Sequence, residues 1–182
     1  MPWWQRALIL AFWVVWGWPF VFRAPHRQNR PSITAAMPTR IGLLLESIAM
    51  FLGFVVRTVT PGPARIAGSV VCGVIAALLS WPAVTHLGKQ FRIQAGLYTD
   101  HELVTTGPYA IVRHPIYASM LAVTLSNLLM WTSWPWIVGA LALFIAGTEI
   151  RVRTEDNLLA GRFGESFRAY QRSVSAYVPF LR

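Results

Sequence analysis

The stretch 101-HELVTTGPYAIVRHPIY-117 lies between two apolar segments and contains two turn signals. Gly107-Pro108 favours a turn, because glycine accepts a positive φ and proline fixes its own φ. His114-Pro115 favours the start of a helix, because proline is tolerated in the first helical turn. The stretch also holds two aromatic rings and a guanidinium: Tyr109, Tyr117 and Arg113. A plain connector does not need so many specific groups, so this is a candidate functional segment.

Composition places the chain in a membrane. Of its 182 residues, 55% are hydrophobic and 13% are charged, whereas soluble domains are about 25% charged. The net charge of +9 comes from basic blocks between apolar runs, so we expect no nucleic-acid partner. Cys72 is the single cysteine, which excludes an internal disulfide and a cysteine-based zinc site. We expect no metal centre.

Five apolar segments approach the length of about 20 residues that a bilayer requires of a helix. They are 3–22, 41–57, 64–86, 116–133 and 135–150. Tryptophans near the ends of the first segment, and at the bend between the last two, are typical of membrane interfaces. We therefore predict an all-α, polytopic membrane helix bundle with about five transmembrane helices. It forms one integral membrane domain, 1–182, with three helices in 1–86 and a helix hairpin, 116–150, inside 87–182.

The character of the chain changes at Arg151, where charged residues begin to alternate with apolar ones. Four apolar residues follow spacings of four, four and three, which is one face of a helix: Leu159, Phe163, Phe167 and Tyr170. Gly161 and Gly164 weaken this helix, so we expect a break near 161–164. We predict a C-terminal amphipathic helix whose basic face lies on the cytoplasmic membrane surface.

The basic residues predict the orientation of the bundle. With five spans, the blocks 23–40, 87–115 and 151–182 fall on one side and hold four, three and six of the 16 Lys and Arg residues. Only Arg6, Arg57 and Arg65 fall on the other side. The positive-inside rule therefore places the C-terminus and both polar blocks in the cytoplasm, and the N-terminus outside.

Two polar residues interrupt the predicted spans. Glu46 lies about two turns beyond Arg40, so we favour a position near the headgroup boundary, with a cavity-lining position as the alternative. Asn127 lies within the fourth segment, where an interhelical hydrogen bond is the favoured interpretation.

A second polar block accompanies the first. It reads Glu155-Asp156-Asn157-Leu158-Leu159, followed by Phe163-Gly164, Phe167 and Tyr170. Together the two blocks resemble the isoprenylcysteine carboxyl methyltransferase family of integral membrane proteins, and phospholipid N-methyltransferases share a related pattern. The resemblance covers roughly residues 87–180. It implies a methyltransferase that uses S-adenosylmethionine (SAM) and acts on a lipid or lipid-linked substrate, above all the carboxylate of an isoprenylcysteine-like group.

The resemblance also implies roles for single residues. The cofactor pocket would comprise His101, Leu103, Val104, Gly107, Pro108, Tyr109, His114, Pro115, Tyr117 and Glu155. The catalytic residues would be Arg113, Arg151 and Glu155. Arg151 and Arg153 are both candidates for holding an anionic substrate group, and spacing does not choose between them. Asp156 stands where the family has a second glutamate and Phe167 where it has a tyrosine, so the chain departs from the pattern at these positions.

The chemistry separates the possible acceptors. Methyl transfer from a sulfonium is an in-line displacement, in which the protein aligns the reactants and keeps water away. A carboxylate that receives the methyl group needs no general base, but it needs a cation that holds it without removing its nucleophilicity. An amine that receives the methyl group needs a base to take its proton. Membrane lipids and a lipophilic or lipidated substrate are the expected partners.

Three alternatives stay open at this point. Phospholipid amine N-methylation is the first. A nicotinamide-dependent membrane reductase is the second, because some sterol reductases resemble this C-terminal half; the short loop 89–115 favours the methyltransferase. A non-catalytic scaffold or transporter is the third, in which Arg113 would bind lipid phosphates and His114 would only begin a helix. The sequence has no strand followed by G-x-G-x-x-G, so a soluble Rossmann methyltransferase is not expected.

Overall fold

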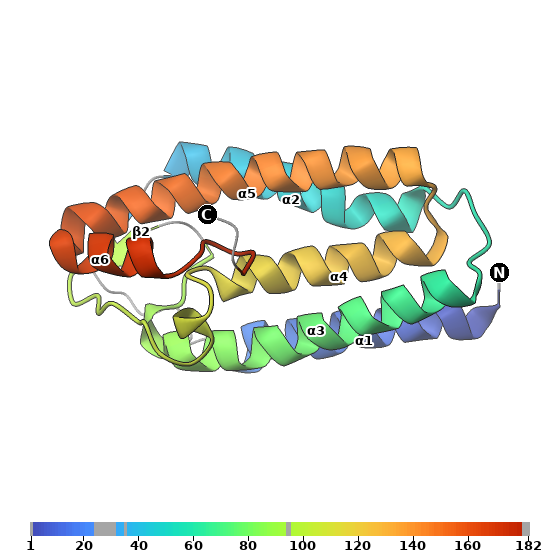
Figure 1. The fold of residues 1–182 in the computed structure, drawn as a ribbon, viewed down its shortest axis with the longest axis horizontal. Coiled ribbons are helices and arrows are strands. Elements are labelled where there is room, and N and C mark those ends of the chain that lie inside the picture. Colours follow the sequence, from blue (N-terminus) through green and yellow to red (C-terminus); the bar gives the residue numbers. More distant parts are fainter. Residues whose placement is uncertain (1, 24–31, 35, 94–95, 180–182) are drawn as a thin grey trace.

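The structure is a computed structural model that describes residues 2–23, 32–34, 36–93 and 96–179. Within these ranges the chain is almost entirely helical (Figure 1). The elements are α1 (Trp3–Phe22), β1 (Ser32–Thr34), α2 (Ala36–Val55), α3 (Pro63–Leu87), the 3-10 helix η1 (Gly88–Gln90), β2 (Gly96–Tyr98), the 3-10 helix η2 (Gly107–Ala110), α4 (Pro115–Trp131), α5 (Trp134–Phe163) and α6 (Glu165–Ser173). The predicted all-α fold is confirmed.

Helix α4 lies at the centre of the bundle. Figure 1 shows α2 and α5 along one side of it and α1 and α3 along the other, and α3, α2 and α1 all pack against it. Most of its residues are buried, including Val123, Leu128 and Trp131. The predicted interhelical role of Asn127 is confirmed, because its Nδ2 donates to the carbonyl of Met50 on α2 at 3.3 Å.

In the part of the chain that the structure describes, four helices are long and apolar enough to cross a bilayer: α1, α2 from Met37, α3 with η1, and α5. The chain is therefore an integral membrane protein. Helix α4 is shorter, at 17 residues, and by helical rise spans only about 26 Å against a hydrocarbon core of about 30 Å. The total of five spans stays a prediction.

Helix α5 does not end at residue 150, where the apolar run ends, but continues for 30 residues to Phe163. The physical reason is that its buried face continues at helical spacing through Thr148, Arg151, Val152 and Asp156. The chain breaks at Gly164, whose φ of 56° suits glycine, inside the predicted interval 161–164. Helix α6 follows, and its docking on the membrane surface stays a prediction.

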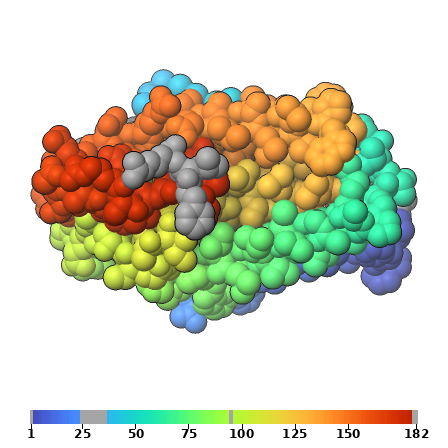
Figure 2. Space-filling model, in the orientation of Figure 1, coloured from blue at the N-terminus to red at the C-terminus, as the bar shows by residue number. Residues whose placement is uncertain are grey.

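Both polar blocks lie at one end of the bundle. Strands β1 and β2 pair antiparallel there, with Ile33 opposite Leu97, and the N-terminus lies at the other end (Figure 1). In Figure 2 the surface of α6 lies beside that of the loop before α4 at this same end. The side of the membrane that this end faces stays a prediction, and Arg27, Arg30 and Arg182, which entered the charge argument, lie outside the described residues.

Candidate active site

A cavity of about 310 Å³ opens at the end of the bundle that holds both polar blocks. Its volume is in the range of small-molecule sites. Nine of the sequence-predicted site residues line it: His101, Leu103, Val104, Tyr109, Arg113, His114, Tyr117, Arg151 and Glu155. Segments distant in sequence thus meet around one space, and the predicted pocket residues lie in a single place.

Three predicted cofactor residues, Gly107, Pro108 and Pro115, do not line the cavity. Gly107 has a φ of 61°, and a side chain there would meet the ring of His86. Pro108 lies in the first turn of η2, and Pro115 begins α4. These residues shape the backbone on which the lining residues are carried, because their conformations fix the two turns.

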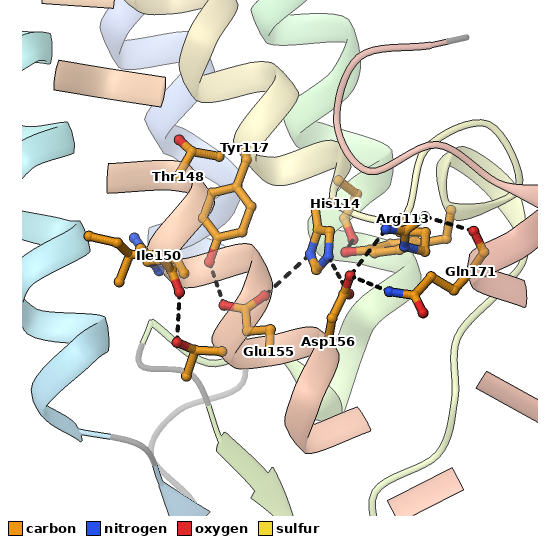
Figure 3. A network of polar contacts seen from close by, with 12 residues as sticks. Arg113, His114, Tyr117, Thr148, Ile150, Glu155, Asp156 and Gln171 are labelled. Carbon is orange, nitrogen blue, oxygen red and sulfur yellow. Dashed lines mark hydrogen bonds and ion pairs between the residues drawn. The ribbon is translucent and has the colours of Figure 1, made fainter. Parts of the chain in front are cut away.

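His114 is the centre of the charged network in Figure 3. Its Nδ1 lies 3.3 Å from Oε2 of Glu155, and its Nε2 lies 2.9 Å from Oδ1 of Asp156. Burial disfavours the charged ring, but the hydrogen bonds to Asp156 and Glu155 outweigh burial and raise the pKa of His114 to about 9. Both ring nitrogens therefore donate, and the side chain is an imidazolium at neutral pH.

Asp156 connects this imidazolium to Arg113. Its Oδ2 accepts from Nη2 of Arg113 at 3.1 Å and from Nε2 of Gln171 at 3.0 Å. Asp156 is buried and does not line the cavity. The shorter side chain at this family position thus holds two cationic cavity residues in place from behind.

Glu155 has both carboxylate oxygens occupied. Oε2 faces His114, and Oε1 accepts from the hydroxyl of Tyr117 (Figure 3). Tyr117 in turn carries the guanidinium of Arg151 over its ring, at 4.8 Å from the centroid. The two helices α4 and α5 are therefore joined by one continuous chain of polar contacts.

The structure separates the two arginines that spacing left undecided. Arg151 is 5% exposed and lines the cavity. The side chain of Arg153 is 78% exposed and pairs with Glu149 on its own helix at 3.2 Å. Arg151 Nη1 lies 2.6 Å from Oε2 of Glu46, which is fully buried. The carboxylate of Glu46 is thus paired inside the bundle and does not line the cavity, and its position relative to the headgroups stays a prediction.

Gln90 ends η1 and lines the cavity, although its sequence context did not predict it as a site residue. Gln90 is 4% exposed, and neither polar atom of its side chain has a hydrogen-bond partner among the described residues. A buried amide without partners costs free energy, so a ligand in the cavity is the natural partner. Its only sequence signal is a polar residue three positions after the end of a long apolar helix.

Helix α6 and the residues after it pack against the first polar block. The backbone N–H groups of Arg113 and His114 donate to the carbonyls of Ser175 and Ala176, each at 2.8 Å. The hydroxyl of Tyr170 donates to the carbonyl of Tyr109 at 2.5 Å. Phe167 is fully buried in the cavity wall, a place where a phenyl ring needs no hydroxyl. In the described part of the chain, no group of three or more His, Cys, Asp or Glu residues is arranged to hold a metal ion.

The chain is similar in sequence to several curated proteins. The protein-S-isoprenylcysteine O-methyltransferase of Schizosaccharomyces pombe is 32% identical over 102 residues, 54% of this chain and 43% of that protein. The protein of the same name from Tribolium castaneum is 30% identical over 118 residues, 63% of this chain and 41% of that protein.

The cobalt-zinc-cadmium resistance protein CzcN of Cupriavidus metallidurans is 39% identical over 95 residues, 50% of this chain and 43% of that protein. The chain thus spans less than half the length of these curated relatives. The model of the isoprenylcysteine carboxyl methyltransferase (ICMT) family matches residues 69–161, which include His101, His114 and Glu155. This chain belongs to the isoprenylcysteine carboxyl methyltransferase family.

Proposed function

We propose that the chain is a SAM-dependent methyltransferase of the membrane, and that its acceptor is the carboxylate of a lipid-linked group such as an isoprenylcysteine. Family membership supports methyl transfer, and the names of two relatives supply the acceptor class. The proposal rests on one observation: the charged network beside the cavity offers hydrogen-bond donors, and each of its carboxylate oxygens already accepts from a donor.

This network contains three cations and three carboxylates. The carboxylates of Glu46, Glu155 and Asp156 have every oxygen bonded to a donor. Their partners include His114, which is protonated and cannot take another proton. An amine acceptor would require a proton acceptor, whereas a carboxylate arrives as a ready nucleophile and requires a cation. The network therefore suits a carboxylate better than an amine.

The cavity wall also suits SAM. Several buried donors and acceptors have no partner among the described residues: Nε of Arg113, Nε of Arg151 and both amide atoms of Gln90. Cationic and anionic groups lie on the same wall, as the zwitterionic end of this cofactor requires. The residues that would hold it are His101, Leu103, Val104, Tyr109, His114, Tyr117 and Glu155. When bound, SAM supplies the electrophilic methyl group.

The remaining tasks fall to the chain itself. Arg151 would hold the acceptor carboxylate, because its guanidinium is fixed by Glu46 and its Nε has no partner among the described residues. Apolar side chains of α1 and α4, including Trp16, Phe20 and Met120, line the same cavity. They would accommodate a hydrocarbon tail and keep water from the reacting carboxylate.

Calorimetric titration of detergent-purified protein tests the cofactor. We expect binding of S-adenosylhomocysteine (SAH) and no binding of NADPH, because the cavity offers the groups described above. Binding of NADPH alone would support a reductase and overturn the proposal, and binding of neither would support a scaffold. Arg153→Ala is the matched control, since its exposed side chain does not line the cavity and SAH binding should stay at the wild-type level.

A further inference from the structure

Glu46 lies outside the family-matching region 69–161 yet reaches the candidate active site. It belongs to α2, is fully buried, and pairs with Arg151 at 2.6 Å. Its second oxygen accepts from Oγ1 of Thr148 at 3.0 Å. A buried carboxylate is expensive unless paired and hydrogen-bonded, and this one has a donor on each oxygen.

Two glycines bring Glu46 to this position. A side chain at Gly42 of α2 would meet the carbonyl of Gly147, and one at Gly147 of α5 would meet the carbonyl of Gly42. The two helices therefore approach backbone to backbone at this level. Helices α2 and α5 run in opposite directions (Figure 1), so Glu46 and Arg151 lie one turn from this crossing on opposite sides of it. A side chain at Gly42 would also meet Cγ of Arg151, and one at Gly147 would meet Cγ of Glu46. The two glycines therefore leave the space across which carboxylate and guanidinium make contact.

The contacts of Arg151 with the described residues engage both terminal nitrogens of its guanidinium and leave Nε for a ligand. Nη1 donates to Glu46, and Nη2 donates to the carbonyl of Ile93 at 2.7 Å. The central carbon of the guanidinium lies over the ring of Tyr117, 4.8 Å from its centroid. Nε is buried and has no partner among the described residues. A rigid, planar guanidinium held at one edge presents its remaining N–H in a fixed direction.

We propose that Glu46 is a positioning residue for methyl transfer, which orients Arg151 and shares its positive charge. This inference rests on the proposed function. An arginine that paired with the acceptor alone would bind its carboxylate tightly and draw charge from the attacking oxygen. Binding of the ground state does not accelerate the chemical step. With Glu46 on one edge, Arg151 can hold the acceptor while the carboxylate stays nucleophilic.

Kinetics of Glu46→Gln test this role, with SAM as donor and an N-acetyl-S-prenylcysteine as acceptor. We expect kcat to fall by about 100-fold, the scale of a misplaced reacting group. We expect the acceptor KM to stay unchanged or to fall, because Arg151 gains a free edge for the carboxylate. The Kd for SAH should remain within about twofold of the wild-type value, since Glu46 does not line the cavity.

Two milder variants cover the case in which Glu46→Gln does not fold. Glu46→Asp keeps the negative charge but shortens the side chain, which moves the carboxylate away from Arg151. Thr148→Val keeps the side-chain shape but removes the hydroxyl that donates to Glu46. Both should lower kcat at constant SAH affinity, Glu46→Asp by more. Ser69→Ala is the matched control, because its hydroxyl is a buried interhelical donor to the carbonyl of Ser126 and does not line the cavity. It should lower Tm and leave kcat unchanged.

The inference fails if Glu46→Asp and Thr148→Val keep wild-type kcat. It also fails if kcat and SAH affinity fall together with Tm in the Glu46 variants, which would indicate a purely structural role. A wild-type protein that methylates no prenylcysteine would instead overturn the proposed function itself. An active wild type with unaffected variants would overturn only the role of Glu46.

Discussion

Arginines at the two ends of the bundle have different kinds of partner. At the cavity end, Arg151 is buried and pairs with Glu46 of α2, and Arg113 is half-buried and pairs with Asp156 of α5. At the opposite end, Nε of Arg65 donates to the carbonyl of Leu129 at 2.9 Å, and the guanidinium of Arg57 lies over the ring of Trp131 at 5.1 Å. Carbonyls and aromatic rings are enough to anchor a helix end. Buried ion pairs cost more to assemble, so their concentration at one end marks that end for function.

The largest expected effect is the loss of cofactor binding at the cavity end. We expect His114→Ala and Glu155→Ala each to abolish SAH binding, because each removes a charged group from the cavity wall. The fold should survive but lose stability, since truncating one partner of a buried ion pair costs about 3–5 kcal/mol. Titration and thermal unfolding in detergent measure both effects. Wild-type affinity in either variant would contradict this role for the cavity end.

The next effect is a dependence of stability on pH that only the cavity end should show. The pKa of His114 is raised to about 9, above the ordinary value of about 6.5. Its contribution to stability is therefore fully present below pH 6.5 and is lost as pH rises through 9. That shift corresponds to about 3 kcal/mol. Tm should fall between pH 7 and pH 10, and this fall should shrink in His114→Asn. An equal fall in both proteins would show that His114 is not the group responsible.

Gln90 should sharpen the comparison by separating ligand binding from stability. We expect Gln90→Leu to weaken SAH binding by about tenfold, the worth of one hydrogen-bonded group. The same change should raise the Tm of the ligand-free protein, because it removes a buried amide without partners. Titration and a melting curve on the same sample decide the point. Lower Tm with unchanged affinity would assign Gln90 to the fold alone.

The smallest effect belongs to the opposite end. Arg65→Ala should leave methyl transfer and SAH affinity at the wild-type level, because Arg65 does not line the cavity. It should cost about 1–2 kcal/mol of stability through hydrogen bonds lost to the carbonyls of Leu129 and Thr132. A drop in SAH affinity would show that the two ends are coupled and break the distinction.

Local patterns predicted much of this molecule. Hydropathy placed helices at 3–22 and 64–86, close to the observed Trp3–Phe22 and Pro63–Leu87. The two polar blocks predicted that Tyr109, His114 and Glu155 line one cavity, as they do. The continuation of α5 beyond residue 150 was not predicted. The apolar run ends there, but the end of an apolar run shows where a membrane span ends and not where the helix ends.

Pairings between distant helices could not be predicted in the same way. Whether Arg151 or Arg153 faces the cavity depends on which face of α5 meets α2, and the partner of Glu46 depends on the same contact. No local periodicity encodes that contact. The close approach depends on Gly42 and Gly147. The sequence does not distinguish these two glycines from other small residues in membrane helices.

The most direct test of the central claim is the chemical nature of the methylated product. Wild-type protein and Arg151→Gln are incubated with methyl-labelled SAM and an N-acetyl-S-prenylcysteine, and the product is treated with base. If the buried Arg151 holds the acceptor carboxylate, wild type produces a base-labile methyl ester and Arg151→Gln produces almost none. A base-stable label, or undiminished ester formation by Arg151→Gln, would contradict the account.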